Sequence, residues 1–320
     1  MKMIYDTTIP DGKKCGGVDV GKDFLDAAVE GGAALRSPNT QEGRAALVEF
    51  FRTHDVGCVG LEASGGYEIE IRNDLRSAGF EAALLQPAQV RAFAKMIGQR
   101  AKTDRIDAAL IARCVAVLKK PAVQEDLRLA ALAERLTFLE QIEEDIARLR
   151  TRRDRFREPD LLAKLAAEIK RRVADRKAAL AELVALLRVH PDLARRFDLI
   201  KSIDGIGPRT ALSLVIRMPE LGSLSREQAA SLAGMAPVTR ESGRWTGQAH
   251  VAGGRKRVGR ALFAAAQAAC QRWNPQLVAM YKRLRAAGKH HSVAVVACAR
   301  KLVIYANTVL AKDTPWTSRC

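Results

Sequence analysis

The sequence predicts an α/β domain in the first part of the chain and mainly helical structure in the rest. Short apolar runs alternate with helical patterns over residues 14–122, as expected of one mixed sheet with helices packed on it. Leucine and isoleucine then recur every three or four residues over residues 129–187, which predicts two long helices. From about residue 199, glycine-rich turns separate helical segments rich in lysine and arginine. A chain of 320 residues has room for this organisation.

The front domain divides into alternating strands and helices. The predicted strands are residues 15–20, 24–29, 56–61 and 80–85, the first two joined by a turn near residues 21–23. Helices are predicted near 41–53, after Glu62, from Pro87 and from residue 104, where Thr103 or Asp104 is expected to cap the helix.

The predicted organisation has four parts: a tail at 1–13, the α/β domain at 14–122, a coiled-coil helical hairpin at 123–198 and a C-terminal domain at 199–320. The apolar seam of the hairpin is interrupted at residues 157–160, so its two helices are expected to run antiparallel. The hairpin is interpreted either as an internal scaffold or as a dimerisation arm. Six arginines lie near its tip, between residues 148 and 157. They are interpreted either as a solvated surface or as a nucleic-acid contact.

The positive charge is concentrated at the C-terminal end. Residues 1–125 carry 17 basic and 17 acidic side chains, whereas residues 201–320 carry 19 basic and 5 acidic ones, a net charge of +14. Such an excess predicts that the back half binds a polyanion such as nucleic acid.

Membrane, secretory and metal-thiolate proteins are not indicated. The N-terminus has no apolar signal segment, and we find no amphipathic anchor or long apolar run. The six cysteines form no Cys-x-x-Cys pair, so we expect reduced cytosolic thiols, without zinc or disulfides.

Four acidic residues form a candidate metal site in the front domain. Asp104 and Asp107 lie three residues apart and share one helix face, where they resist joint ionisation unless a cation neutralises them. Asp19 interrupts an apolar strand, and Glu62 ends another strand, where active groups of open sheets collect. Mg²⁺ or Mn²⁺ prefers such oxygen ligands. The alternative is that the aspartates complement the dipole of a solvated first helical turn.

The neighbouring acids are expected to have no part in the site. Asp26, Glu68 and Glu70 are predicted to lie on the surface, and Asp23 to belong to the hairpin turn. The other four acids follow a particular order: an aspartate on the first strand, a glutamate ending a later strand and two aspartates on the closing helix. This order resembles that of the RuvC/RNase H-like nucleases. That resemblance implies four carboxylates that hold two divalent ions.

Residues 199–211 are predicted to form a helix-hairpin-helix. Gly205 and Gly207 permit a tight turn whose N–H groups, beside Arg209 and a helix N-terminus, can bind a DNA phosphate. A plain glycine-rich turn between two helices is the alternative.

Further motifs follow at set intervals in the C-terminal domain. They are Leu232-Ala233-Gly234-Met235-Ala236-Pro237, Glu241-Ser242-Gly243-Arg244, Gly253-Gly254-Arg255-Lys256-Arg257, Gly259-Arg260, Asn274-Pro275 and Arg300-Lys301-Leu302. With the acids, they resemble the DEDD-motif insertion-sequence transposases of the group that includes Piv-type DNA invertases (the "IS-one-ten" family). The resemblance runs from about Gly16 to Leu310.

This resemblance implies a Mg²⁺-dependent (or Mn²⁺-dependent) recombinase with Asp19, Glu62, Asp104 and Asp107 as catalytic metal ligands and Ser242 as nucleophile. It also implies a structured guide RNA, encoded by the element, that pairs with donor and target DNA. The candidate residues for nucleic-acid binding are Gly205, Gly207, Arg209, Arg244, Arg255, Lys256, Arg257 and Arg260. The expected partners are double-stranded DNA, this RNA and further copies of the chain in a dimer or tetramer, in the cytoplasm beside the nucleoid.

Two other functions are compatible with parts of the pattern. A RuvC-like structure-specific nuclease would use metal-activated water and would need the four acids but not Ser242. An architectural nucleic-acid-binding protein would not need an intact set of acids. The spacing of the five histidines does not fit tyrosine recombinases or His-hydrophobic-His transposases.

Overall fold

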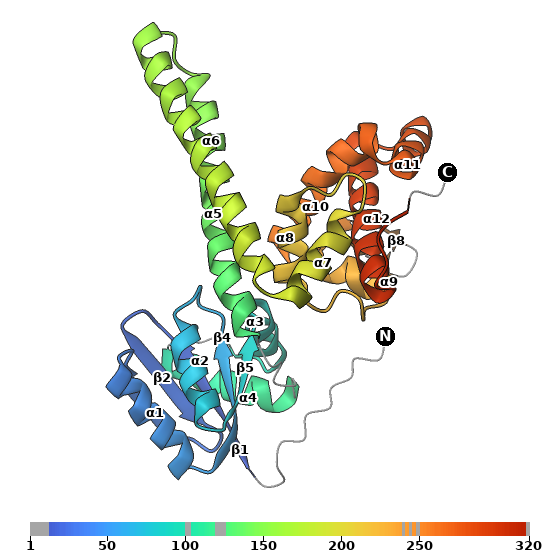
Figure 1. Cartoon of the computed structure of the whole chain (residues 1–320). Helices are drawn as coiled ribbons and strands as arrows, with labels where there is room; N and C mark the ends of the chain where they lie inside the picture. The colour runs from blue at the N-terminus through green and yellow to red at the C-terminus, as the bar shows by residue number, and fades with distance from the viewer. Residues whose placement is uncertain are drawn as a thin grey trace. The chain divides into compact units, whose positions relative to one another are not determined.

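The computed structural model describes residues 13–99, 104–118, 126–238, 241–242, 245–247 and 250–317. The chain forms two compact units, Met1–Gln124 and Glu125–Cys320, whose elements are labelled in Figure 1. The first twelve residues of the predicted tail lie outside the described part of the chain.

The first unit contains a five-stranded mixed sheet in the order β3-β2-β1-β4-β5. Its strands are β1 (Lys14–Val20), β2 (Phe24–Val29), β3 (Ala34–Pro38), β4 (Val56–Glu62) and β5 (Glu81–Leu85). The first three strands pair antiparallel, and β1, β4 and β5 pair parallel. The predicted α/β character is confirmed, whereas β3 was not predicted.

Helices cover both faces of this sheet. They are α1 (Gln41–Thr53), α2 (Glu68–Ser77), α3 (Pro87–Met96) and α4 (Asp104–Leu118). One core joins the sheet to Phe51 of α1 and Leu75 of α2, and another joins it to Phe93 of α3 and Ile111 of α4. Parallel strands need this cover because both of their faces are apolar.

Two consecutive glycines of β1 explain how closely the helices approach. A Cβ atom at Gly16 would lie 2.5 Å from the ring of Phe51, and one at Gly17 would lie 2.3 Å from the Ala108 carbonyl oxygen. Successive strand residues point to opposite faces, so the pair makes room for α1 on one side and α4 on the other.

The second unit is mainly helical. It comprises α5 (Leu127–Arg153), α6 (Pro159–Arg188), α7 (Pro191–Lys201), α8 (Pro208–Arg217), α9 (Arg226–Leu232), α10 (Lys256–Ala268), the π-helix η1 (Ala269–Trp273), α11 (Pro275–Ala286) and α12 (His291–Ala311). Four two-residue strands complete it: β6 (Pro237–Val238), β7 (Glu241–Ser242), β8 (Trp245–Thr246) and β9 (His250–Val251). Strand β6 pairs with β9, and β7 pairs with β8.

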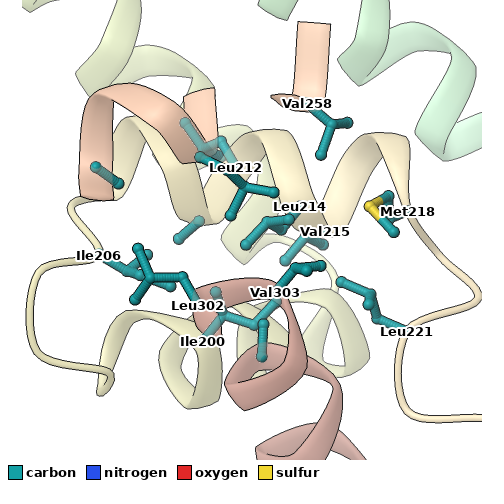
Figure 2. Close-up of a cluster of buried hydrophobic side chains, with 14 of the residues drawn as sticks. Ile200, Ile206, Leu212, Leu214, Val215, Met218, Leu221, Val258, Leu302 and Val303 are labelled. Carbon is teal, nitrogen blue, oxygen red and sulfur yellow. The ribbon is translucent and has the colours of Figure 1, made fainter. Parts of the chain in front are cut away.

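The core of this unit gathers α7 to α12 around α8 and α12. Figure 2 shows part of it, where Leu212 and Val215 of α8 lie near Leu302 and Val303 of α12, all at most 1% exposed. The same core includes the base of the α5–α6 hairpin, through Leu136 of α5 and other buried leucines. The hairpin is therefore packed into the unit at its base.

Farther from the base, the α5–α6 hairpin extends beyond the other helices of the unit (Figure 1). Its apolar seam is only half-buried there, at Leu149 of α5 and at Leu162, Leu165, Ile169 and Val173 of α6. Two helices alone cannot surround a heptad seam, so one side remains open to solvent.

Helix α12 is long and apolar enough to cross a membrane by length and composition. More than half of its most apolar window, 56%, is nevertheless buried inside the unit, as in a core helix. This buried helix is an exception to the expected absence of a long apolar run.

Candidate functional site

The predicted acids Asp19 and Glu62 lie on the face of the sheet that α4 covers. Gly17 and Gly60 face α4, because Cβ atoms there would meet Ala108 and Ile111 respectively. Asp19 and Glu62 each follow two residues later, and side chains at that spacing share a face.

Strand pairing brings these two carboxylates to one end of adjacent strands. Val18 pairs with Leu61 in the parallel register of β1 and β4, and the next residues of the two strands are Asp19 and Glu62. Both side chains are half-buried. Their place at the carboxyl ends of parallel strands is where open sheets carry their active groups.

Helix α4 runs antiparallel to β1 and therefore begins near the same end. Its distal residue Cys114 shares a core cluster with Cys15 at the start of β1, whereas Ala108 lies over Gly17 farther along. Asp107, half-buried, precedes Ala108 by one residue. Asp104 is the first residue of α4, and its side chain lies outside the described part of the structure.

The donor chemistry of this end fits a hard divalent cation, because carboxylate oxygens are the ligands that such ions prefer. Among the described side chains, which do not include that of Asp104, no group of three or more His, Cys, Asp or Glu is arranged to hold a metal ion. The acids are thus brought to one edge, and a complete ligand set remains a prediction.

Two neighbouring acids are less exposed than the sequence predicted. Asp26 pairs with Asp19 across β1 and β2, and its side chain is only 13% exposed beside Arg36. Glu68, 7% exposed, accepts hydrogen bonds from the Ser64 and Gly66 N–H groups and from the Ser64 hydroxyl. The prediction of surface positions for Asp26 and Glu68 is therefore wrong. Glu70, also predicted at the surface, is exposed and lies 2.7 Å from Arg44.

In the second unit, Ser242 ends the two-residue strand β7. It pairs antiparallel with Trp245, the first residue of β8. Gly243 and Arg244, the next two residues, lie outside the described part of the chain.

The two predicted glycines of the turn between α7 and α8 differ in backbone conformation and in the space around them. Gly205 has a φ of +95°, and a Cβ atom there would lie 2.3 Å from the Ala269 Cβ of η1. The Asn274 side chain donates a hydrogen bond to the neighbouring Asp204 carbonyl oxygen. Gly207 has an ordinary φ of −83° and open space around it, directly before α8. Gly205 is therefore accounted for by packing, and Gly207 is the glycine accessible to a ligand.

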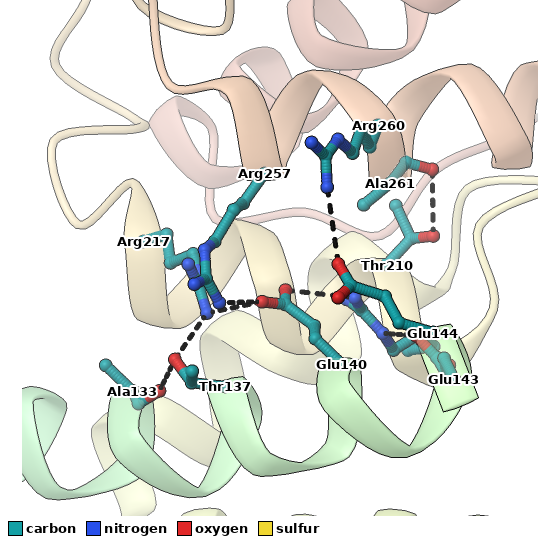
Figure 3. A network of polar contacts seen from close by, with 11 residues as sticks. Ala133, Thr137, Glu140, Glu143, Glu144, Thr210, Arg217, Arg257, Arg260 and Ala261 are labelled. Atoms are coloured by element: carbon teal, nitrogen blue, oxygen red, sulfur yellow. Dashed lines mark hydrogen bonds and ion pairs between the residues drawn. The ribbon is translucent and has the colours of Figure 1, made fainter. Parts of the chain in front are cut away.

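Two of the predicted nucleic-acid-binding arginines, Arg209 and Arg257, contact one buried carboxylate, and so does Arg217, which was not predicted. Glu140 of α5 accepts hydrogen bonds from Arg209 (3.0 Å), Arg217 (2.9 Å) and Arg257, and Figure 3 shows the network. Arg209 also bonds Glu143 at 3.0 Å. This network ties α8 and α10 to the middle of α5.

Arg255, another predicted contact, is held in a separate pair. Its guanidinium donates to both carboxylate oxygens of Glu220, at 2.6 and 2.8 Å, and to the Arg217 carbonyl oxygen at 2.7 Å. Burial alone would raise the pKa of Glu220, but the hydrogen bonds from Arg255 lower it below the ordinary value. Lys256 and Arg260 lie one and five residues farther along, and both are exposed.

Comparison with known proteins identifies the chain. A transposase family model named for the DEDD motif and IS110 matches residues 16–158, and a model of the IS116/IS110/IS902 transposase family matches residues 197–282. The chain belongs to the IS110 family of transposases. Both halves of the sequence resemblance are thereby confirmed.

Individual relatives agree with this assignment. The chain is 27% identical to the pilin gene-inverting protein of Moraxella bovis over 95% of its own length and 97% of the relative's. The corresponding protein of Moraxella lacunata matches equally well. An uncharacterised insertion-element IS110 protein of Streptomyces coelicolor is 34% identical over 45% of this chain and 35% of that protein.

The chain is accordingly a DNA transposase or recombinase, and its relatives imply that it binds DNA. The DEDD type of its first domain suggests dependence on a divalent metal.

Proposed function

We propose that the protein cuts and rejoins DNA at the ends of an insertion sequence through a phosphoserine intermediate formed on Ser242. The metal ligands in this proposal are Asp19, Glu62, Asp104 and Asp107, and the ion is Mg²⁺, with Mn²⁺ as a substitute. The observation that carries the proposal is the meeting of Asp19, Glu62 and the start of α4 at one edge of the sheet. The same arrangement favours an RNase H-like, RuvC-type first domain.

The chemistry of the proposed step is a transesterification. The Ser242 hydroxyl oxygen forms a bond to a DNA phosphorus, the bond from that phosphorus to the 3′-oxygen breaks, and the 3′-oxygen leaves as a hydroxyl. The serine proton passes to a general base, and a general acid such as a water molecule delivers the proton that the leaving 3′-oxygen takes up. A second 3′-hydroxyl then attacks the phosphoserine and restores the serine, so no external energy source is needed. Bound divalent ions would supply Lewis-acid activation of the attacking and leaving oxygens.

A guide RNA and several copies of the chain complete the proposal. The family resemblance supports an element-encoded RNA that selects donor and target by base pairing, while the protein contacts the backbone. The half-exposed seam of the α5–α6 hairpin supports a homo-oligomer, a dimer or tetramer, in which acids and serine act together. Gly207 at the start of α8 and the arginines of α10 are the proposed nucleic-acid contacts, together with Arg244.

The deciding experiment uses labelled element-end DNA with the RNA transcribed from its flank and Mg²⁺, resolved on a denaturing gel. Wild type is compared with Ser242→Ala and Asp104→Ala. The proposal expects a protease-sensitive protein–DNA adduct that both substitutions abolish, with activity reduced by more than about a hundredfold, as for other nucleophile deletions.

A RuvC-like nuclease that uses activated water is the competing function. It predicts free cleaved ends that persist in Ser242→Ala and disappear in Asp104→Ala. That result would exclude the serine mechanism. Asp23→Ala, in the turn between β1 and β2, serves as the matched control because it removes a carboxylate that the proposal does not use.

A further inference from the structure

A groove of about 780 Å³ lies within the second unit, between the hairpin and α10. Helices α5, α6, α8 and α10 all contribute to its walls. Six basic side chains and three carboxylates line it, so that its formal charge is positive. The basic side chains are Arg150, Arg176, Arg209, Lys256, Arg257 and Arg260.

The three carboxylates of the groove are already engaged by arginine. Glu140 and Glu143 accept from Arg209, and Glu140 also accepts from Arg257 and from Arg217 behind it (Figure 3). Glu144 lies 3.5 Å from Arg260. These contacts neutralise the acids and hold the arginines of α8 and α10 in fixed positions on one side of the groove.

The other three basic side chains of the groove, Arg150, Arg176 and Lys256, are not engaged by its carboxylates. Within the described part of the chain, the side chains of Arg150, Arg176 and Lys256 make no hydrogen bond or ion pair, and all three residues are exposed. They come from three different helices, α5, α6 and α10, and border one space. Unpaired cations around a groove without a free carboxylate attract a polyanion.

The rest of the lining indicates which polyanion fits. It consists of Ile146, three alanines and Thr210, and the described residues around the groove include no aromatic side chain. Unpaired bases of RNA and single strands are bound by stacking on aromatic rings, whereas a duplex is held through its phosphates. The lining therefore favours a duplex backbone.

We propose that this groove binds the sugar–phosphate backbone of double-stranded DNA, with Arg150, Arg176 and Lys256 as the phosphate contacts. The inference builds on the proposed recombination function and names the surface of the second unit that takes the DNA. It also separates these contacts from Arg255, whose guanidinium is committed to Glu220.

The test measures the affinity of the full chain for a random-sequence DNA duplex and for an RNA stem-loop of equal charge, as a function of salt. EDTA is present, so that no cleavage contributes. The variant Arg150→Ala/Arg176→Ala/Lys256→Ala removes the three contacts. Its plot of log affinity against log salt for the duplex should be shallower by about 2.7, because each phosphate contact contributes about 0.9.

The matched control removes three exposed cations of the second unit that do not line the groove, as Lys170→Ala/Lys177→Ala/Lys282→Ala. It should leave the slope within about one of wild type, since these side chains do not border the groove. A second variant, Arg150→Lys/Arg176→Lys/Lys256→Arg, keeps every charge and should retain duplex binding. Far-UV circular dichroism verifies that all variants are folded.

Each other outcome overturns the inference. Equal slopes for the groove variant and the control would show that only net charge matters. Loss of RNA binding with duplex binding intact would reassign the groove to RNA. If the wild type bound no duplex at all, the proposed recombination function would fail together with the groove assignment. In the two preceding outcomes, only the assignment of the groove to DNA fails.

Discussion

Glu68 shows how one buried carboxylate organises the chain directly after Glu62. Its burial opposes ionisation, but hydrogen bonds from its own N–H, from Gly66 and from Ser64 outweigh that effect, so the pKa of Glu68 is lowered. A carboxyl group with a depressed pKa in the folded state stabilises the fold above its unfolded pKa, about 4.3. That stabilisation is lost as the pH falls through the lower folded value.

We therefore predict that Glu68→Gln lowers the free energy of unfolding by about 2 kcal/mol at neutral pH, because a charge-assisted set of buried hydrogen bonds is weakened. The difference from wild type should shrink as the pH falls below about 4. Urea unfolding followed by circular dichroism at a series of pH values measures it. Glu70→Gln, exposed on the same helix, is the control, and a pH-independent difference would contradict the assignment to Glu68 ionisation.

Residue positions close in sequence were easier to predict than long-range partners. The acids at Asp19, Glu62 and Asp107 reach one edge because strand alternation and helix order follow from local patterns. The partners of Arg209, Arg217 and Arg257 did not follow, because they share Glu140 from 69, 77 and 117 residues away. The surface position predicted for Glu68 was wrong because an acid in a first helical turn is usually solvated. Here the Glu68 carboxylate instead bonds to the preceding segment at Ser64 and Gly66.

At the scale of elements, the α7–α8 turn offers a direct comparison of two glycines. We predict that Gly205→Ala destabilises the second unit by about 2 kcal/mol or more, because the new Cβ adds a left-handed conformational penalty and meets Ala269. Gly207→Ala should change stability by less than about 1 kcal/mol, since its φ is ordinary and the space around it is open. Thermal unfolding monitored by Trp fluorescence distinguishes them. Equal destabilisation would contradict the packing role of Gly205.

Elements with long periodic patterns were predicted, and short ones were not. Strands β1, β2, β4 and β5 and the two long helices carry apolar repeats that identify them. Strand β3, at the sheet edge, contains Arg36 and Ser37 and lacks a buried apolar run. The two-residue strands around Ser242 contain too few residues for any periodicity, so the sequence predicts no strand there. The change from α-helix to π-helix between α10 and η1 likewise has no local sequence signal.

At the scale of the whole molecule, the open seam of the α5–α6 hairpin predicts self-association. The double substitution Leu165→Lys/Ile169→Lys should convert an oligomer into a species of 35.0 kDa in size-exclusion chromatography with light scattering, because charge on an apolar seam opposes its burial. The control Ala163→Lys/Ala167→Lys carries the same charges at exposed positions with the same spacing. Monomeric wild type, or equal behaviour of both variants with unchanged helicity, would argue against association through this seam.

The Glu140 network has a mechanical consequence for the hairpin. Glu140 lies near the middle of the 27-residue helix α5 and fastens it to α8 and α10, so the part of α5 beyond Glu140 is about 20 Å long at 1.5 Å per residue. A tilt of about 10° at Glu140 would displace the far end of α5 by about 3.5 Å over that length. A shift of α10 when DNA enters the neighbouring groove would thus be amplified along the hairpin. Occupancy of the groove would in this way reposition the seam on which we expect another copy to dock.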